Sequence, residues 1–197
     1  VTDQRMKNDM IKYGFDPAII LISGNPYFST FNTLTQTSEK YITFFSQPLS
    51  ELVEEKKLEP RPYDELTVLS DFIDTIKKLG INLPIKIILH PRTKNKTKFD
   101  NIIQKSRLKI TIETNQLNEI LIQNSKLIFG MTTVVLQQAA LMGKPVISYQ
   151  PGMENNDPLT SNKLGFSKAV YKKENLKRAV KYSLSNPIIN IDRIKKY

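Results

Sequence analysis

From residue 41 onward, short apolar runs alternate with longer segments whose apolar residues recur at helical spacing. Five runs rich in β-branched and aromatic residues predict strands, at 41–46, 85–89, 108–112, 127–129 and 146–149. The segments between them predict helices, at 64–79, 97–106, 116–124 and 133–142. Because strands that alternate with helices pair in parallel, we expect an α/β fold with a doubly wound, Rossmann-like parallel sheet.

The N-terminal part of the chain departs from this alternation. Residues 3–13 predict an amphipathic helix that ends at Gly14, and residues 18–23 predict a short buried strand. The stretch 24–40 is rich in Ser, Thr and Asn, which predicts a linker between two lobes. We therefore expect three parts: 1–30, the end of a truncated N-terminal lobe plus linker; 31–185, the Rossmann-like domain; and 186–197, a C-terminal tail.

Beyond the last predicted strand, the residues that follow Gly152 are polar and rich in turn formers, which predicts a surface loop near a ligand. Residues 175–183 predict a basic helix.

The composition excludes several classes of site. The chain of 197 residues has no cysteine, which excludes disulfides, thiol nucleophiles and cysteine-ligated zinc, and its single histidine makes an imidazole metal site improbable. It has no apolar run near the roughly 20 residues of a membrane helix and no signal peptide at its start, so we expect a cytoplasmic protein.

The net charge of +10 suggests an anionic partner, and the alternative, which we favour, is a lysine-rich solvated surface. The lysines are not interleaved with aromatic residues, so we expect no nucleic-acid binding. The basic surface would also suit peripheral association with a membrane.

The most informative segment is 126–152, which predicts a complete strand, turn, helix and strand. Its first strand ends at Gly130, where the backbone can approach a ligand closely. Thr132 and Thr133 then occupy the expected N-cap region of the helix, where free N–H groups and the positive end of the helix dipole would face an anion. The alternative is that the threonines merely cap the helix.

Polar residues follow every predicted strand of the sheet. In an open parallel sheet, ligands bind beyond the carboxyl ends of the strands, so these residues are expected to converge. They are Ser46-Gln47-Pro48, His90-Pro91-Arg92, Glu113-Thr114-Asn115, Gly130-Met131-Thr132-Thr133 and Gln150-Pro151-Gly152.

His90 directly follows an apolar strand, and Pro91 favours an extended backbone there. Its imidazole could donate a hydrogen bond to a phosphate, or carry positive charge as a leaving group becomes negative. A histidine bonded to a neighbouring loop is the alternative. Arg92 and Thr93 strengthen the interpretation as a phosphate site, because the guanidinium of Arg92 matches phosphate oxygens, whereas Lys94, Lys96 and Lys98 are expected to be solvated.

Helical geometry sets Gln137 and Gln138 about 100° apart, so only one can face a ligand. Gln138 is our candidate for contact with a ribose or base, against the alternative of a surface glutamine. The chain has neither a Walker-type phosphate loop nor a Gly-x-Gly-x-x-Gly turn, which argues against an ATPase and a conventional dehydrogenase. A general base for sugar chemistry is also not evident.

These residues carry a family resemblance. His90-Pro91-Arg92, followed some forty residues later by Thr132-Thr133, an Ala-Ala-Leu helix and Gly143-Lys144-Pro145-Val146, resembles the C-terminal nucleotide-sugar domain of GT-B glycosyltransferases. The nearest likeness is to capsule-type sialyl- and polysialyltransferases and to CDP-glycerol transferases. Gly24-Asn25-Pro26-Tyr27 resembles the end of the N-terminal lobe in such proteins.

The resemblance implies that His90, Thr132 and Thr133 grip the nucleotide and its phosphates. The substrate-binding set would also include Ser46, Gln47, Pro91, Arg92, Gly130, Met131, Gln138 and Gln150. Many of these enzymes have Glu where this chain has Gln138. The implied donor is a CMP-, CDP- or UDP-linked sugar, no metal is required, and the saccharide acceptor would bind a missing N-terminal lobe.

The expected function is therefore donor binding in a glycosyltransferase for surface or capsular polysaccharide, with this chain inactive by itself. A UDP-N-acetylglucosamine 2-epimerase shares the two-lobed fold, but it should have an acidic pair where this chain has Gln137 and Gln138. A nucleotide-binding module without catalysis is the other alternative.

Overall fold

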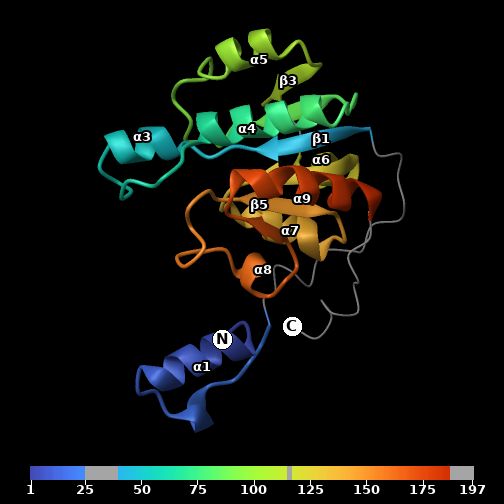
Figure 1. The fold of residues 1–197 in the computed structure, drawn as a ribbon. Coiled ribbons are helices and arrows are strands. Elements are labelled where there is room, and N and C mark those ends of the chain that lie inside the picture. Colours follow the sequence, from blue (N-terminus) through green and yellow to red (C-terminus); the bar gives the residue numbers. More distant parts are fainter. Residues whose placement is uncertain (25–39, 115–116, 187–197) are drawn as a thin grey trace.

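A computed structural model describes residues 1–24, 40–114 and 117–186. Its centre is a six-stranded sheet in which all neighbouring strands are parallel, in the order β3-β2-β1-β4-β5-β6 (Figure 1). This confirms the predicted doubly wound sheet. The strands are β1 (Tyr41–Phe45), β2 (Ile85–Ile88), β3 (Ile110–Glu113), β4 (Ser125–Gly130), β5 (Val146–Tyr149) and β6 (Lys168–Val170).

Helices cover both faces of this sheet. The α-helices are α1 (Gln4–Lys12), α3 (Leu49–Glu54), α4 (Glu65–Lys78), α5 (Asp100–Ser106), α6 (Asn118–Gln123), α7 (Val134–Leu141), α8 (Thr160–Lys163) and α9 (Lys173–Ser185). One hydrophobic cluster joins α4 and α9 to one face, and a second joins α6 and α7 to the other. In Figure 1, α1 lies apart from the sheet, and it has no buried residues.

Aromatic side chains fill the larger cluster. Phe129 of β4 stacks on Phe72 of α4 with ring centroids 3.9 Å apart, and Phe44 and Tyr149 pack beside it. The central strands are buried on both faces, so their sequences are continuous apolar runs without an alternating pattern. This is why the sequence placed β1, β4 and β5 correctly.

The helices begin and end where local chemistry favours it. Asp64 caps α4 by accepting a hydrogen bond of 2.7 Å from the backbone N–H of Thr67. Asp3 caps α1 in the same way, which confirms the predicted first helix. After α7 the chain turns at Gly143, whose φ of +80° is accessible to glycine without strain.

The predicted buried strand at 18–23 is wrong. Residues Pro17–Ile19 form a 3-10 helix, because Asp16 accepts a hydrogen bond of 2.8 Å from the N–H of Ala18 and Pro17 favours a turn. Ile19 and Leu21 are 71% and 79% exposed, and of residues 18–23 only Ile20 is buried. Apolar residues there had no neighbouring strand to pair with.

Three short elements were not predicted, namely α3, α8 and β6. α8 lies within the predicted polar loop after β5, and β6 adds a sixth strand at the sheet edge. The predicted basic helix is α9. The predicted linker at 24–40, the motif that begins at Gly24, and the C-terminal tail lie almost entirely outside the described residues. Within the described ranges, no helix has the length and apolar character needed to cross a membrane.

Candidate functional site

The candidate site lies where the strand order reverses, between β1 and β4. The register aligns Ile88 of β2 and Gly130 of β4 with Phe45 of β1. Two residues beyond these aligned positions the chain has His90 after β2, Gln47 after β1 and Thr132 after β4. Neighbouring strands are about 4.8 Å apart, so the three polar residues emerge side by side at the carboxyl edge.

Gln47 and Thr132 are joined by direct hydrogen bonds. The side-chain oxygen Oε1 of Gln47 accepts hydrogen bonds from the backbone N–H of Thr132 at 2.8 Å and from its hydroxyl at 3.0 Å. These residues are 85 positions apart in the chain. The predicted convergence of the β1 and β4 ends is therefore a physical contact.

Gly130 leaves little space for a side chain. A Cβ at this position would lie 3.1 Å from the backbone oxygen of Phe45 and 3.1 Å from Cδ2 of Leu136. The glycine thus allows β4 to end in close contact with β1 and with α7, which fixes the start of the following turn.

The N-terminus of α7 opens from this turn. Thr133 is the N-cap residue, and its hydroxyl accepts a long hydrogen bond of 3.4 Å from the N–H of Val135. The backbone N–H groups of Thr133 and Val134 donate to no acceptor within the described residues. Thr133 therefore caps the helix, which was the alternative to anion binding. Two N–H donors at the positive end of the helix nevertheless remain for a ligand.

His90 is half-buried and held in one orientation. Its Nδ1 accepts a hydrogen bond of 3.1 Å from the backbone N–H of Arg92, and its carbonyl accepts one of 2.8 Å from Thr93. Partial burial, and then the charge of Arg92, lower the pKa of His90 below 6.5. The imidazole is thus neutral at pH 7, and because Nδ1 is an acceptor, the proton is on Nε2, which is ready to donate.

Buried hydroxyl groups without partners lie near the same edge. Oγ of Ser46, after β1, and Oγ1 of Thr93, after β2, make no hydrogen bond within the described part of the chain, although both residues are almost fully buried. A buried polar group without a partner is costly, so such groups commonly mark a missing ligand or water. Thr93 is a candidate that sequence reasoning placed only as an accessory to Arg92.

The loop that carries His90 is anchored by a buried ion cluster. Nζ of Lys98 lies 2.9 Å from Glu51 of α3 and 2.5 Å from Glu65 of α4, whose side chain is fully buried. Glu51 also accepts hydrogen bonds from the backbone N–H groups of Lys94, at 2.8 Å, and Asn95, at 3.4 Å. The prediction that Lys98 is solvated is therefore wrong.

Sequence reasoning missed Glu51 and Glu65. They lie 47 and 33 positions from Lys98, and no local pattern distinguishes a buried carboxylate from a surface one on an amphipathic helix. Lys94 is exposed, but it also pairs with Glu55. Three acidic residues, Glu51, Glu55 and Glu65, thus hold this loop through Lys94 and Lys98.

The side chain of Gln150, after β5, is held by hydrogen bonds within the protein. Its amide nitrogen donates to Oγ of Ser148 at 2.8 Å and to Asp157 at 2.9 Å. Asp157 also accepts hydrogen bonds from the hydroxyl of Tyr171 and from the backbone N–H of Leu159. The side chain is fully buried, and only its Oε1 has no partner among the described residues.

Gln138 points toward α6. It is 3% exposed, and its amide donates a hydrogen bond of 3.3 Å to the exposed carboxylate of Glu119. A carboxylate from α6 is therefore adjacent to the position where GT-B enzymes commonly have Glu on the helix itself. Sequence reasoning missed Glu119 because it treated the helix in isolation.

The other predicted residues occupy varied places. The side chain of Met131 lies in the hydrophobic core, and its carbonyl accepts a hydrogen bond of 2.5 Å from Ser148, so only its backbone N–H is left for a ligand. Pro91 and Arg92 are exposed. Glu113, after β3, pairs with Lys86 at 3.0 Å.

An open pocket adjoins the carboxyl end of β5. It has a volume of about 670 Å³ and is lined by residues 56–62, Gly152, Met153 and Asn156. Within the described ranges, no group of three or more acidic, histidine or cysteine side chains could hold a metal ion.

No family model and no curated protein matches this sequence. Solved structures do match it by fold. UDP-N-acetylglucosamine 2-epimerase from Neisseria meningitidis, bound to UDP-GlcNAc, matches 94% of this chain and 54% of its own, with a TM-score of 0.62 and 13% identity. A Listeria monocytogenes protein named as the same type of epimerase matches 93% of this chain and 50% of its own, with a TM-score of 0.59 and 17% identity.

The pneumococcal O-GlcNAc transferase, solved in complex with UDP and GlcNAc, matches all of this chain and 40% of its own, with a TM-score of 0.55 and 11% identity. The chain spans about half the length of the epimerases. At these identities the likeness shows the fold: the chain has the Rossmann-like fold of a GT-B-type lobe, as the sequence resemblance implied.

Proposed function

We propose that this chain binds the donor nucleotide sugar of a GT-B glycosyltransferase that acts in the synthesis of a surface or capsular polysaccharide. The observation that carries the proposal is the alignment of His90, Gln47 and Thr132 at the reversal point of the sheet. This point is where doubly wound sheets bind nucleotides.

The site offers hydrogen-bond donors to an anion from three sides. The donors that we assign to the phosphate are Nε2–H of His90, the free N–H groups at the start of α7 and the hydroxyl of Ser46, which has no partner among the described residues. Preorganised donors of this kind stabilise charge as it develops on a leaving group. The nucleotide phosphate would thus be held in place and stabilised as the sugar departs, while a second lobe supplies the acceptor and the general base.

The proposal is tested by titrating the chain with CMP, CDP, UMP and UDP and following backbone amide resonances. We expect at least one nucleotide to shift the resonances of Gly130, Thr133 and His90. The nucleotide that causes the largest shifts identifies the base. If none of the four perturbs these residues, the chain has no donor site at this edge.

The single histidine gives a second, independent readout. A phosphate bound at Nε2 favours the positively charged imidazole, so nucleotide should raise the pKa of His90 from its lowered value in the free protein. The pKa is measured from the histidine nitrogen resonances between pH 5 and 8. An unchanged pKa at saturating nucleotide would place the phosphate away from His90.

Glu119 is expected to contribute to ribose recognition through its contact with Gln138. Glu119→Gln keeps the size of the side chain but removes the charged acceptor, and hydrogen bonds to charged groups are roughly twice as strong as neutral ones. We expect about fivefold weaker nucleotide binding, from calorimetry, with little change for the corresponding 2′,3′-dideoxynucleotide. An equal loss for both ligands would contradict a ribose contact.

The second candidate is an epimerase-like enzyme, which the fold similarity to two UDP-N-acetylglucosamine 2-epimerases favours. The neutral side chains of Gln137 and Gln138 argue against it, since this reaction should require acidic residues on α7. Formation of UDP-N-acetylmannosamine from UDP-N-acetylglucosamine, followed by anion-exchange chromatography, would support the epimerase and contradict the transferase proposal. Nucleotide binding without either reaction in a two-lobed protein would support a binding module.

A further inference from the structure

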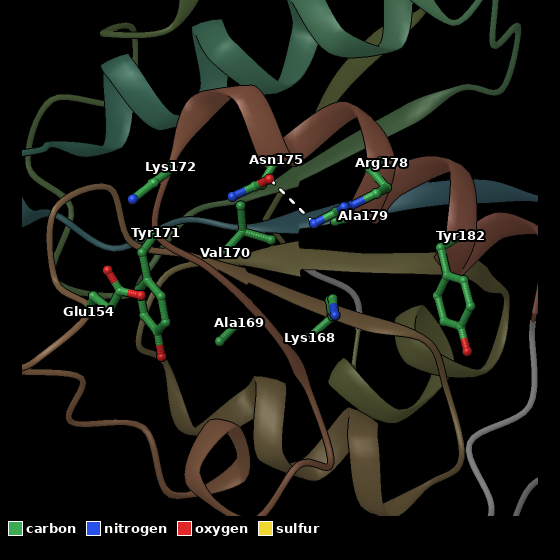
Figure 2. Close-up of a pocket in the computed structure, with 10 residues that line it drawn as sticks. All are labelled: Glu154, Lys168, Ala169, Val170, Tyr171, Lys172, Asn175, Arg178, Ala179 and Tyr182. Carbon is green, nitrogen blue, oxygen red and sulfur yellow. Dashed lines mark hydrogen bonds between the residues drawn. The ribbon is translucent and has the colours of Figure 1, made fainter.

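A second pocket lies at the β6 edge of the sheet, between the edge strand β6 and α9. It has a volume of about 400 Å³, within the range of about 300–1,000 Å³ that is usual for ligand sites. Figure 2 shows that the residues lining it are spread out along β6 and α9, from Glu154 and Tyr171 to Tyr182. Its lining is Glu154, Lys168 to Lys172, Asn175, Arg178, Ala179 and Tyr182. We call this pocket the β6–α9 groove.

The groove is basic along its length, with Lys172 near Tyr171 and with Lys168 and Arg178 toward Tyr182 (Figure 2). Lys168, Lys172 and Arg178 are exposed and make no ion pair within the described residues. Arg178 is held only by a long hydrogen bond of 3.4 Å to Asn175. Its single acidic residue, Glu154, lies beside Tyr171, at the end away from Tyr182 (Figure 2). The groove therefore has cations that pair with no carboxylate among the described residues, which fits an anionic ligand.

An exposed aromatic side chain completes the groove. Tyr182 is 62% exposed and stands at the end where Lys168 and Arg178 lie (Figure 2). An amphipathic ring presented to solvent commonly packs against the apolar face of a ligand. The ligand should thus combine negative charge with a flat apolar face.

Other anionic polymers fit these features less well. Strand addition by an acidic peptide needs a long open edge, whereas β6 has three residues and begins at an exposed lysine, which is a device that blocks edge pairing. Single-stranded nucleic acid needs several stacking aromatics, whereas the groove has only Tyr182 exposed. A chain of carboxylated sugars offers charge, extended shape and apolar ring faces together.

We propose that the β6–α9 groove binds an extended acidic saccharide. The choice of a saccharide rests on the proposed function, whereas the anionic and elongated character of the ligand follows from the groove. Because the groove lies at the β6 edge, two strands beyond β4 at the reversal point, it would hold a growing acidic polymer beside the transfer site and not in it. Such binding would favour repeated addition to the same chain.

The test is calorimetric titration of the complete chain with an α2,8-linked sialic acid tetramer, and with maltotetraose as the neutral control. We expect saturable binding of the acidic tetramer, weakened by added salt, and none of the neutral one. Lys168→Ala with Arg178→Ala should weaken binding about tenfold, since each exposed ion pair contributes modestly. Tyr182→Ala, which removes no charge, should weaken it about threefold.

The matched control is Lys177→Ala, which removes one charge from the exposed surface of α9 outside the groove and should change affinity by less than about twofold. An equal loss in this control, no binding of the tetramer, or tighter binding of a glutamate peptide or an oligothymidine would each overturn the proposal.

Nucleotide titration of the same variants separates the two sites. Unchanged nucleotide binding with lost saccharide binding supports both proposals, and lost nucleotide binding would show that the groove is not a separate site.

Discussion

Replacing Lys98 with alanine is expected to lower the free energy of unfolding by about 3–5 kcal/mol, the usual effect of breaking a buried ion pair from one side. Lys98 lies between Glu51 and Glu65, and its side chain is 6% exposed. Without the ammonium group, two carboxylates remain close together, and that of Glu65 is fully buried. Urea unfolding followed by circular dichroism measures the change.

Lys96→Ala is the control, because Lys96 is exposed in the same loop and should cost less than about 0.5 kcal/mol. Removing the charges together, by Lys98→Met with Glu51→Gln and Glu65→Gln, should recover much of the lost stability, because neutral groups carry a smaller desolvation penalty. A loss below about 1 kcal/mol for Lys98→Ala would contradict the buried cluster.

The cluster also makes stability depend on pH. Burial raises the pKa of Glu51, but the hydrogen bonds from the N–H of Lys94 and from Lys98 together lower it by more than burial raises it. The net pKa is therefore below 4.5. Protons thus bind the unfolded chain more readily than the native protein. The contribution of Glu51 is fully present above pH 4.5 and decreases as the pH falls through the lowered pKa.

Replacing His90 with alanine is expected to reduce sugar transfer about 100-fold in a protein that carries both lobes, which is the typical effect of removing one preorganised donor from a developing negative charge. The hydrogen bond from Arg92 leaves Nε2–H as the donor of the neutral imidazole. Nucleotide affinity should fall less than the transfer rate, because the charge on the phosphate is largest as the sugar leaves. Steady-state kinetics with a saturating acceptor measure both.

His90→Gln distinguishes a chemical role from a structural one. Its side-chain amide can place an N–H group near the position of Nε2, so this variant should retain more activity than His90→Ala while both keep the wild-type unfolding midpoint. Full transfer activity in a folded His90→Ala protein would remove the residue from the mechanism and favour the binding-module alternative.

The strands of the sheet were predictable because burial on both faces gives a continuous apolar run. β1, β4 and β5 were placed within two residues for this reason. The same signal failed at 18–23, where apolar residues occur without a strand to pair with and Asp16 and Pro17 form a turn. β6 was missed because a three-residue edge strand carries too little pattern.

The candidate site was predictable only as a set of strand ends. The sequence identified Gln47, His90 and Thr132 because each follows a predicted strand, and the carboxyl ends of parallel strands lie at one edge of the sheet. It could not show that Gln47 bonds Thr132, or that Gln150 and Met131 are occupied by structural contacts. Those facts depend on which side chains meet across 7 to 85 positions of sequence.

The sequence by itself determined the alternation of strands and helices, the glycine and threonine turn after β4, and the polar residues at the strand ends, because each is a local pattern. Only the tertiary structure decided which carboxylates support the site. Glu119 meets Gln138 between two helices, and Glu51 and Glu65 meet Lys98 beneath the His90 loop. A charged side chain has the same local pattern on a surface or in an ion pair, and its role is set by the partner that the fold brings within reach.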